Sequence, residues 1–472
     1  MKLRAKKIRE DLTMNFCSIK KRCFLPAIFL CFYFSGCGGD LEHVPNPFEE
    51  AEGSAGTEKI VVIGAGVSGI NSETTGGLLV PLKPVTLDEY ELFDGAAALK
   101  SEDPIEIPFA GMHALAVGGF VYTNNPEQGT LTVFSTATGA LEGIVRVGSS
   151  PGALLFDPTQ QFLFVLNQGG IGDSRKDSIS IVDVNPTTTT FLQAITRVAV
   201  EDDPYDIALS TQRNRAFVSN RRSGTVSVID LDSSNLDTFL SVTQSIELGP
   251  SPGQLEYSPI SGHLYVVLNF PTAADSIAIL DADAPGNAEV LSGIPRGIDS
   301  DELSQVRFIR VSNDGSFLWV AFSDGIAAID ARTNSVLSKL TISEFLPNRI
   351  IEANNALLFV SGLEGSGEVL LIDASVPLAL QEVSRVSLGL DSQAKNFVMN
   401  TDQTRVYVLN SLSKEKGSVS VIDVATRELL DTIRVDGLDP HTIVLVSSAD
   451  LDVREGMDDL GDHGHDPGHH TP

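Results

Sequence analysis

Short runs in which apolar and polar residues alternate recur through most of the chain after residue 58. The clearest runs end in aspartate, as in Val226-Ser227-Val228-Ile229-Asp230 and Val419-Ser420-Val421-Ile422-Asp423. A run of this kind, rich in β-branched residues and bounded by turn residues, predicts a β-strand. No convincing helical period is visible in this part of the sequence, so the pattern predicts an all-β fold.

The Asp-ended runs recur about every 47 residues, and a repeat of this length indicates a repeated structural unit. Each unit also has an earlier run that ends in a small or amide residue, such as Phe120-Val121-Tyr122-Thr123-Asn124, and two further apolar runs. Four short antiparallel strands per unit are typical of a β-propeller blade. Such a sheet is apolar on both faces, and packing of blade against blade around an axis covers both of them.

The endings of the second strands and the Asp-ended third strands resemble the YVTN-type β-propeller repeats of bacterial and archaeal surface proteins, over roughly residues 59–447. The resemblance implies a single propeller and leaves its ligand open. Residues 439–445 predict an opening strand with no blade after it, so we expect this C-terminal strand to pair with the N-terminal blade. Eight four-stranded blades are favoured, and seven is the alternative if residues 59–108 pack elsewhere.

All four cysteines lie within the first 37 residues, so the rest of the chain has no thiol for a disulfide, a metal or a covalent haem. The basic residues at 20–22 and the uncharged stretch 23–34 predict a signal peptide, because that stretch is too short for a membrane span. Phe34-Ser35-Gly36-Cys37 resembles the bacterial lipoprotein box, which implies cleavage before Cys37 and its acylation. An ordinary secretory signal or an uncleaved anchor is the alternative.

The domain organisation follows from these features and from composition. We expect a signal peptide with lipoprotein box at 1–37, an acidic Pro/Gly tether at 38–58, the propeller at 59–449 and a disordered, acidic, His-rich tail at 450–472. Glycine after Cys37 implies the outer membrane of the bacterial cell envelope. The formal net charge of −29 argues against a nucleic-acid partner, because a phosphate backbone needs a basic face.

The strand that opens each unit is expected to line the axial channel, so its first residues can be read in register around the ring. The first position gives His113, Gly152, Tyr205, Gly253, Ser304, Asn348, Lys395 and His441. The second gives Ala114, Ala153, Asp206, Gln254, Gln305, Arg349, Asn396 and Thr442. The channel-mouth candidates are His113, Tyr205, Asp206, Arg349, Lys395 and His441.

These candidates have side chains that suit binding or proton transfer. With eight blades, His113 and His441 would sit on neighbouring blades, where neutral imidazoles can ligate a metal or act as a base. The other four candidates could complete a polar pocket for an anionic or metal ligand. A second cluster, in the tail, suits weak binding of a divalent metal; its histidines are His463, His465, His469 and His470.

The sequence lacks the Gly-x-Ser-x-Gly, His-Glu-x-x-His and phosphate-loop motifs that mark common enzyme classes. We therefore expect a lipid-anchored, non-catalytic binding module without a cofactor, whose partner is a protein or glycan of the cell envelope. One alternative is an envelope enzyme or redox-metal protein that uses the channel mouth. Another is metal capture by the tail.

Overall fold

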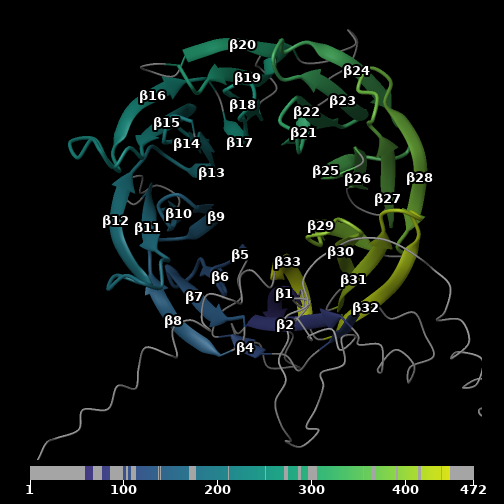
Figure 1. Cartoon of the computed structure of the whole chain (residues 1–472), viewed down its shortest axis with the longest axis horizontal. Coiled ribbons are helices and arrows are strands. Elements are labelled where there is room, and N and C mark those ends of the chain that lie inside the picture. The colour runs from purple at the N-terminus through teal and green to yellow at the C-terminus, as the bar shows by residue number, and fades with distance from the viewer. Residues whose placement is uncertain are drawn as a thin grey trace, which may run out of the picture. The chain divides into compact units, whose positions relative to one another are not determined.

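Short antiparallel β-strands make up the regular structure of this chain, arranged around a central axis (Figure 1). The computed structural model describes residues 59–446 with internal gaps, the longest of which are 67–76, 85–98 and 296–305. Within these residues there is no helix of the length and hydrophobicity that a membrane crossing requires.

Seven sheets have four strands each, joined in chain order. The first three blades are β5 (Ala114–Val117), β6 (Phe120–Asn125), β7 (Thr130–Ser135), β8 (Leu141–Arg146); β9 (Pro151–Asp157), β10 (Phe162–Gln168), β11 (Asp177–Asp183), β12 (Gln193–Ala199); and β13 (Pro204–Ser210), β14 (Arg215–Asn220), β15 (Thr225–Asp230), β16 (Val242–Glu247). The next two are β17 (Pro252–Ser258), β18 (His263–Leu268), β19 (Asp275–Asp281), β20 (Glu289–Pro295); and β21 (Val306–Val311), β22 (Phe317–Phe322), β23 (Gly325–Asp330), β24 (Val336–Thr341). The last two are β25 (Pro347–Ala353), β26 (Leu357–Gly362), β27 (Glu368–Asp373), β28 (Gln381–Ser387); and β29 (Gln393–Met399), β30 (Arg405–Leu412), β31 (Lys416–Asp423), β32 (Leu429–Asp436).

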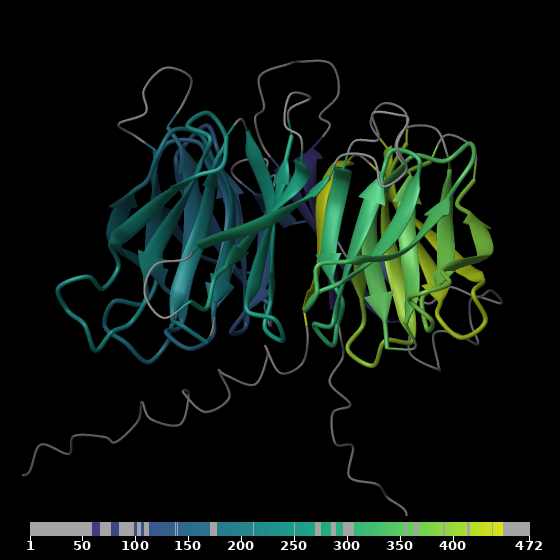
Figure 2. The same cartoon turned by 90° about the horizontal axis from the view of Figure 1, so that it is seen from above.

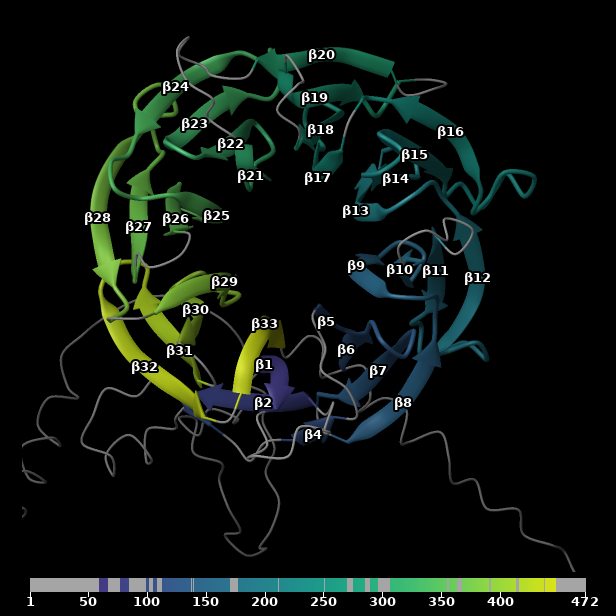
Figure 3. The ribbon, with the colours of Figure 1, turned by 180° about the vertical axis from the view of Figure 1, so that it is seen from behind.

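The first strand of each blade lies nearest the axis and the fourth lies at the rim, as Figures 1 and 3 show from the two ends of the ring. The side view in Figure 2 shows the strands of each blade running between the two faces of the ring. This arrangement confirms the all-β propeller with four-stranded blades that the repeat predicted.

The number of blades differs from the favoured prediction of eight, because the structure has seven four-stranded blades. The remaining sector holds a five-stranded sheet of other construction, with β1 (Lys59–Gly66), β2 (Gly77–Pro84), β3 (Leu99–Ser101), β4 (Ile105–Ile107) and β33 (Leu438–Val446). Strand β33 pairs antiparallel with β1, with Val62 opposite Ile443. The expected pairing of the C-terminal strand with the N-terminal strands is therefore present, in a sheet unlike the repeated blades.

The core lies between neighbouring blades and accounts for the nearly continuous apolar runs in the sequence. All six residues of β7 are buried, and so are five of the six in β15. One cluster packs Tyr122 of β6 against Val165 of β10, and another packs Trp319 of β22 against Val360 of β26. A middle strand that is covered on both faces has no solvent side, and its side chains are apolar or small.

The aspartates that end the third strands form turns, as their position in the repeat predicts. The Asp183 carboxylate accepts the Asn185 backbone N–H at 2.9 Å, and Asp373 does the same for Ser375 at 2.9 Å. The asparagines that end the second strands behave differently. Asn220 reaches across the sheet and donates from Nδ2 to Thr225 Oγ1 at 3.1 Å and Ser227 Oγ at 2.9 Å.

The same asparagine-to-hydroxyl pattern occurs in four blades, at Asn125, Asn167, Asn220 and Asn410. It explains why the third strands of these blades alternate serine or threonine with leucine, valine or isoleucine. Asn167 also accepts the Gly148 N–H at 2.8 Å, where any Cβ on Gly148 would overlap the amide. In the blade β21–β24 the corresponding positions hold Phe322 and Ala327, and no such network forms there.

Replacing Asn220 with alanine should lower the free energy of unfolding by about 2–4 kcal/mol, because two buried hydroxyls lose their donor. Denaturant unfolding followed by circular dichroism measures the loss. The matched control is Asn235→Ala in the loop of the same blade, where the side chain is exposed and the stability should stay within about 0.5 kcal/mol. Equal effects of the two substitutions would contradict a structural role for the network.

Candidate functional site

A cavity of about 950 Å³ opens among the inner strands of the ring. It is lined by residues that begin the first strands, such as Pro151 and Asn348, and by residues that end the second strands, such as Asn124 and Gln168. Side chains of both kinds lie at the same end of the channel, because the first and second strands are antiparallel. The cavity is therefore the mouth of the axial channel.

Four of the six candidates from the sequence line this cavity: His113, Tyr205, Asp206 and Arg349. Lys395 is half-buried on the inner strand β29, with an interaction of its own, and it does not line the cavity. His441 belongs to β33, at a point where the pairing with β1 is irregular, and its side chain lies outside the described residues. Cys37 and the four tail histidines also lie outside them.

The register read from the sequence also placed Gly152, Gln254, Asn396 and Thr442 correctly at the cavity wall. It failed in one blade, because Ser304 and Gln305 lie before β21 and outside the described residues. Strand β21 instead presents Arg307 and Phe308 at the corresponding positions. The sequence reading therefore missed one cationic residue of the cavity.

Two further charged residues at the cavity were missed, Glu256 and Arg310. Glu256 stands two residues after Gln254, which the register identified. Arg310 stands two residues after Phe308, which the register should have identified. Because side chains alternate along a strand, the residue two places on points to the same side. That alternation was the signal that could have revealed them.

Side chains in the cavity wall also tie neighbouring inner strands together. Asp206 of β13 accepts the Leu255 N–H of β17 at 2.9 Å and its own neighbour's N–H, from Ile207, at 2.8 Å. Gln254 of β17 donates to Ile309 O at 2.8 Å and accepts the Ile309 N–H at 3.0 Å. These contacts supply hydrogen bonds between blades whose backbones do not pair.

Burial raises the pKa of both carboxylates at the cavity. The pKa of Asp206 rises to about 6, although its two backbone hydrogen bonds oppose the rise. The pKa of Glu256 rises to about 7, mainly through burial, with the Asp206 charge adding and the Arg310 charge opposing. The Arg310 guanidinium stands 3.7 Å from Glu256 and is half exposed, so its compensation is partial.

Arg349 presents a guanidinium to the cavity without a carboxylate partner in the part of the chain that the structure describes. Its charge centre lies 5.7 Å from the ring of Phe308, within cation–π range. Loss of hydration in the channel lowers the pKa of Arg349. Loss of hydration, and then the charge of Arg349, lower the pKa of His113 below its ordinary value.

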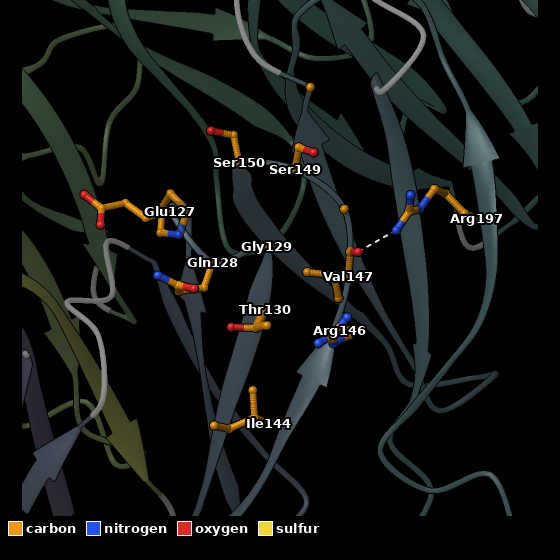
Figure 4. A pocket seen from close by; sticks show the side chains of 13 residues that line it. Glu127, Gln128, Gly129, Thr130, Ile144, Arg146, Val147, Ser149, Ser150 and Arg197 are labelled. Atoms are coloured by element: carbon orange, nitrogen blue, oxygen red, sulfur yellow. Dashed lines mark hydrogen bonds between the residues drawn. The ribbon is translucent and has the colours of Figure 1, made fainter. Parts of the chain in front are cut away.

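A second cavity, of about 690 Å³, has Pro126 and Ser150 in common with the first. Figure 4 shows the side chains that line this second cavity. Arg146 of β8 and Arg197 of β12 line it, and Arg197 donates to the Val147 carbonyl. Both side chains are exposed. Across the described residues, no group of three histidine, cysteine or carboxylate side chains is placed to hold a metal ion.

Comparison with known proteins supports the fold. The family model described as Lactonase, 7-bladed beta-propeller, matches residues 116–239, which is less than half of the chain. No curated protein matches the sequence.

Solved structures resemble the chain over most of its length. NirN, titled dihydro-heme d1 dehydrogenase in complex with DHE, is 13% identical over 82% of this chain and 74% of its own, with a TM-score of 0.58. Apo AztD from Citrobacter koseri is 13% identical over 83% of this chain and 98% of its own, with a TM-score of 0.56. A Lactobacillus plantarum protein is 14% identical over 83% of this chain and 99% of its own, with a TM-score of 0.50. At these identities the likeness shows the propeller fold alone.

The raised pKa values predict a pH dependence of stability that Glu256 should control. A carboxyl group whose pKa is higher in the folded than in the unfolded protein binds extra protons in the folded state, so stability falls as pH rises from about 4 to 7. Glu256→Gln removes this contribution. Between pH 4.5 and pH 8, we expect the free energy of unfolding of Glu256→Gln to rise by about 3 kcal/mol relative to that of the wild type, as measured by urea unfolding.

The same Gln substitution at Glu428, which is exposed at the rim, controls for the loss of one negative charge. A difference between wild type and Glu256→Gln that stays constant across this pH range would show that Glu256 titrates normally.

Proposed function

We propose that this protein is a non-catalytic binding module of the cell envelope, whose channel mouth receives an anionic group presented by a protein or glycan partner. The observation that carries the proposal is Arg349, a guanidinium that faces a large cavity and has no carboxylate partner among the described residues. Fold alone does not identify a ligand, so the argument rests on the chemistry of this wall.

A guanidinium keeps its charge throughout the physiological pH range and offers a planar set of donors that matches a carboxylate or phosphate. Arg349 is exposed to the cavity, and a partial loss of hydration there lowers its pKa. An anion that enters the cavity therefore competes with less water than it would at an open surface. The imidazole of His113 and the phenol of Tyr205 line the same cavity and can supply further hydrogen bonds.

Replacing Arg349 with methionine should weaken binding of a simple anion, pentanoate or phosphate, by about tenfold or more. Dissociation constants can be measured with the purified protein by ligand-observed NMR at low ionic strength. The control is Arg332→Met. Arg332 is exposed in the turn after β23, and its replacement should leave binding unchanged. Equal affinities of wild type and Arg349→Met would refute the role of Arg349.

A second candidate function is hydrolysis, and the two carboxylates at the cavity favour it. Groups with pKa values of about 6 and 7 suit general acid–base catalysis at neutral pH. Because a lactonase family model matches part of the chain, a lactone is the first substrate to test in an assay for hydrolysis. Turnover that is lost in Glu256→Gln and retained in Arg349→Met would favour this candidate over the binding module.

Metal binding is the remaining alternative, at His113 with His441 or in the tail at His463, His465, His469 and His470. Two histidines do not specify a metal site, and flexible histidine-rich segments bind divalent metals weakly. Metal analysis of the purified protein with and without residues 450–472 separates these two places.

The proposed location is the bacterial envelope, with lipid on Cys37 and the outer membrane as the site of anchoring. Each buried methylene of an acyl chain contributes about 0.8 kcal/mol, so a multiply acylated cysteine holds firmly. Cys37→Ala should move the protein from the membrane fraction to the soluble fraction of the envelope in cell fractionation. Retention of the variant in the membrane would indicate an uncleaved anchor instead of lipid.

A further inference from the structure

The channel mouth carries charges of both signs, and they are separated around the ring. The carboxylates Asp206 and Glu256 come from the adjacent inner strands β13 and β17. The guanidiniums of Arg307, Arg310 and Arg349 come from the next two inner strands, β21 and β25. Figure 1 shows β13, β17, β21 and β25 in this order around the axis. A ligand in the cavity therefore meets an acidic sector and a basic sector side by side.

The acidic sector lacks a full counter-charge. The one cation paired with Glu256 among the described residues is the half-exposed Arg310, at 3.7 Å. The other partners are backbone N–H groups, which carry no net charge: Val311 donates to Glu256 at 3.4 Å, and Leu255 and Ile207 donate to Asp206. Within the described residues no lysine or arginine forms an ion pair with Asp206. Each carboxylate retains lone pairs that can accept further donors. An ammonium group placed here would gain charge-assisted hydrogen bonds and relieve the repulsion between the two acids.

In the basic sector, Arg349 lacks a negatively charged partner among the described residues. It has an aromatic neighbour, Phe308. Arg307 is exposed on the same wall. A carboxylate on the ligand can accept from this sector while an ammonium on the same ligand donates to the other.

We propose that the ligand of the channel mouth is a zwitterion, with a carboxylate bound at Arg349 and an ammonium group bound at Asp206 and Glu256. This inference rests on the proposed anion-binding function and narrows its ligand class. The cavity of about 950 Å³ lies at the upper end of the range for small-molecule pockets, about 300–1,000 Å³. A free amino acid leaves most of that volume empty, so an extended zwitterion, with its two charges separated along a chain, fits better.

The test compares ligands of matched length on the wild-type protein, so it does not depend on the folding of any variant. Pentanoate, glutarate and 5-aminopentanoate share one carboxylate and differ at the far end. We expect 5-aminopentanoate to bind about tenfold more tightly than pentanoate, because of its charge-assisted hydrogen bonds. Glutarate should bind more weakly than pentanoate, because its second carboxylate meets Asp206 and Glu256.

A series of ω-amino acids of increasing length then measures the distance between the two sectors, with an optimum expected at one length. Short peptides form the second arm, because a free N-terminus and a free C-terminus carry the same two charges. Di-, tri- and tetra-alanine are compared with the same peptides acetylated or amidated at the ends. Binding of peptides only when both ends are free would identify a peptide as the source, and preference for ω-amino acids would identify a small molecule.

Substitutions locate each charge. Glu256→Gln and Asp206→Asn should bring 5-aminopentanoate to the affinity of pentanoate and leave pentanoate binding intact or stronger. Arg349→Met should weaken both ligands. Asp232→Asn, in an exposed loop of the blade that carries Asp206, is the control and should change neither.

The outcomes separate this inference from the function on which it rests. Pentanoate and 5-aminopentanoate that bind equally, with Arg349 required for both, would overturn the zwitterion and keep the anion site. No binding of either ligand at concentrations up to tens of millimolar would overturn both. Tighter binding of 5-aminopentanoate that persists in both Glu256→Gln and Asp206→Asn would place the ammonium elsewhere and refute the assignment.

Discussion

The constraint on which the whole structure depends is that each blade is apolar on both faces. A strand such as β7, buried along its whole length, has no side that can meet water. One four-stranded sheet therefore cannot stand alone, and each must pack between two others until the ring is complete. The channel follows from this packing, because the first strands of successive blades contact one another around the axis.

Polar groups are concentrated where the apolar contact ends. At the third strands, asparagine amides satisfy the hydroxyls of four blades, so serine and threonine can lie within a dry interface. At the inner strands, side chains such as Asp206 and Gln254 join blades that have no backbone pairing. Asp206 thus serves both the ring and the cavity, and burial at this place raises the pKa values of Asp206 and Glu256.

The sequence predicted the fold and most of the cavity wall because both obey a repeat. Asp206 and Arg349 were found since proline or a turn residue marks the start of their strands. In β21, Val306 stands where β13 and β25 have Pro204 and Pro347, so that mark is absent and Arg307 was missed. Eight blades were expected because residues 59–108 contain strand-like runs, but the described strands of this segment form a sheet with different pairing. The ion pairing of Glu256 depends on tertiary contacts that no local pattern encodes.

The pairing of β1 with β33 joins residues 59–66 to residues 438–446. A ribosome makes the first of these strands long before the second, so during synthesis β1 has one edge without a partner and two neighbouring blades have an uncovered face. Contacts this distant in sequence form late and slowly. A nascent or truncated chain that lacks β33 exposes a strand edge, and an exposed edge favours aggregation.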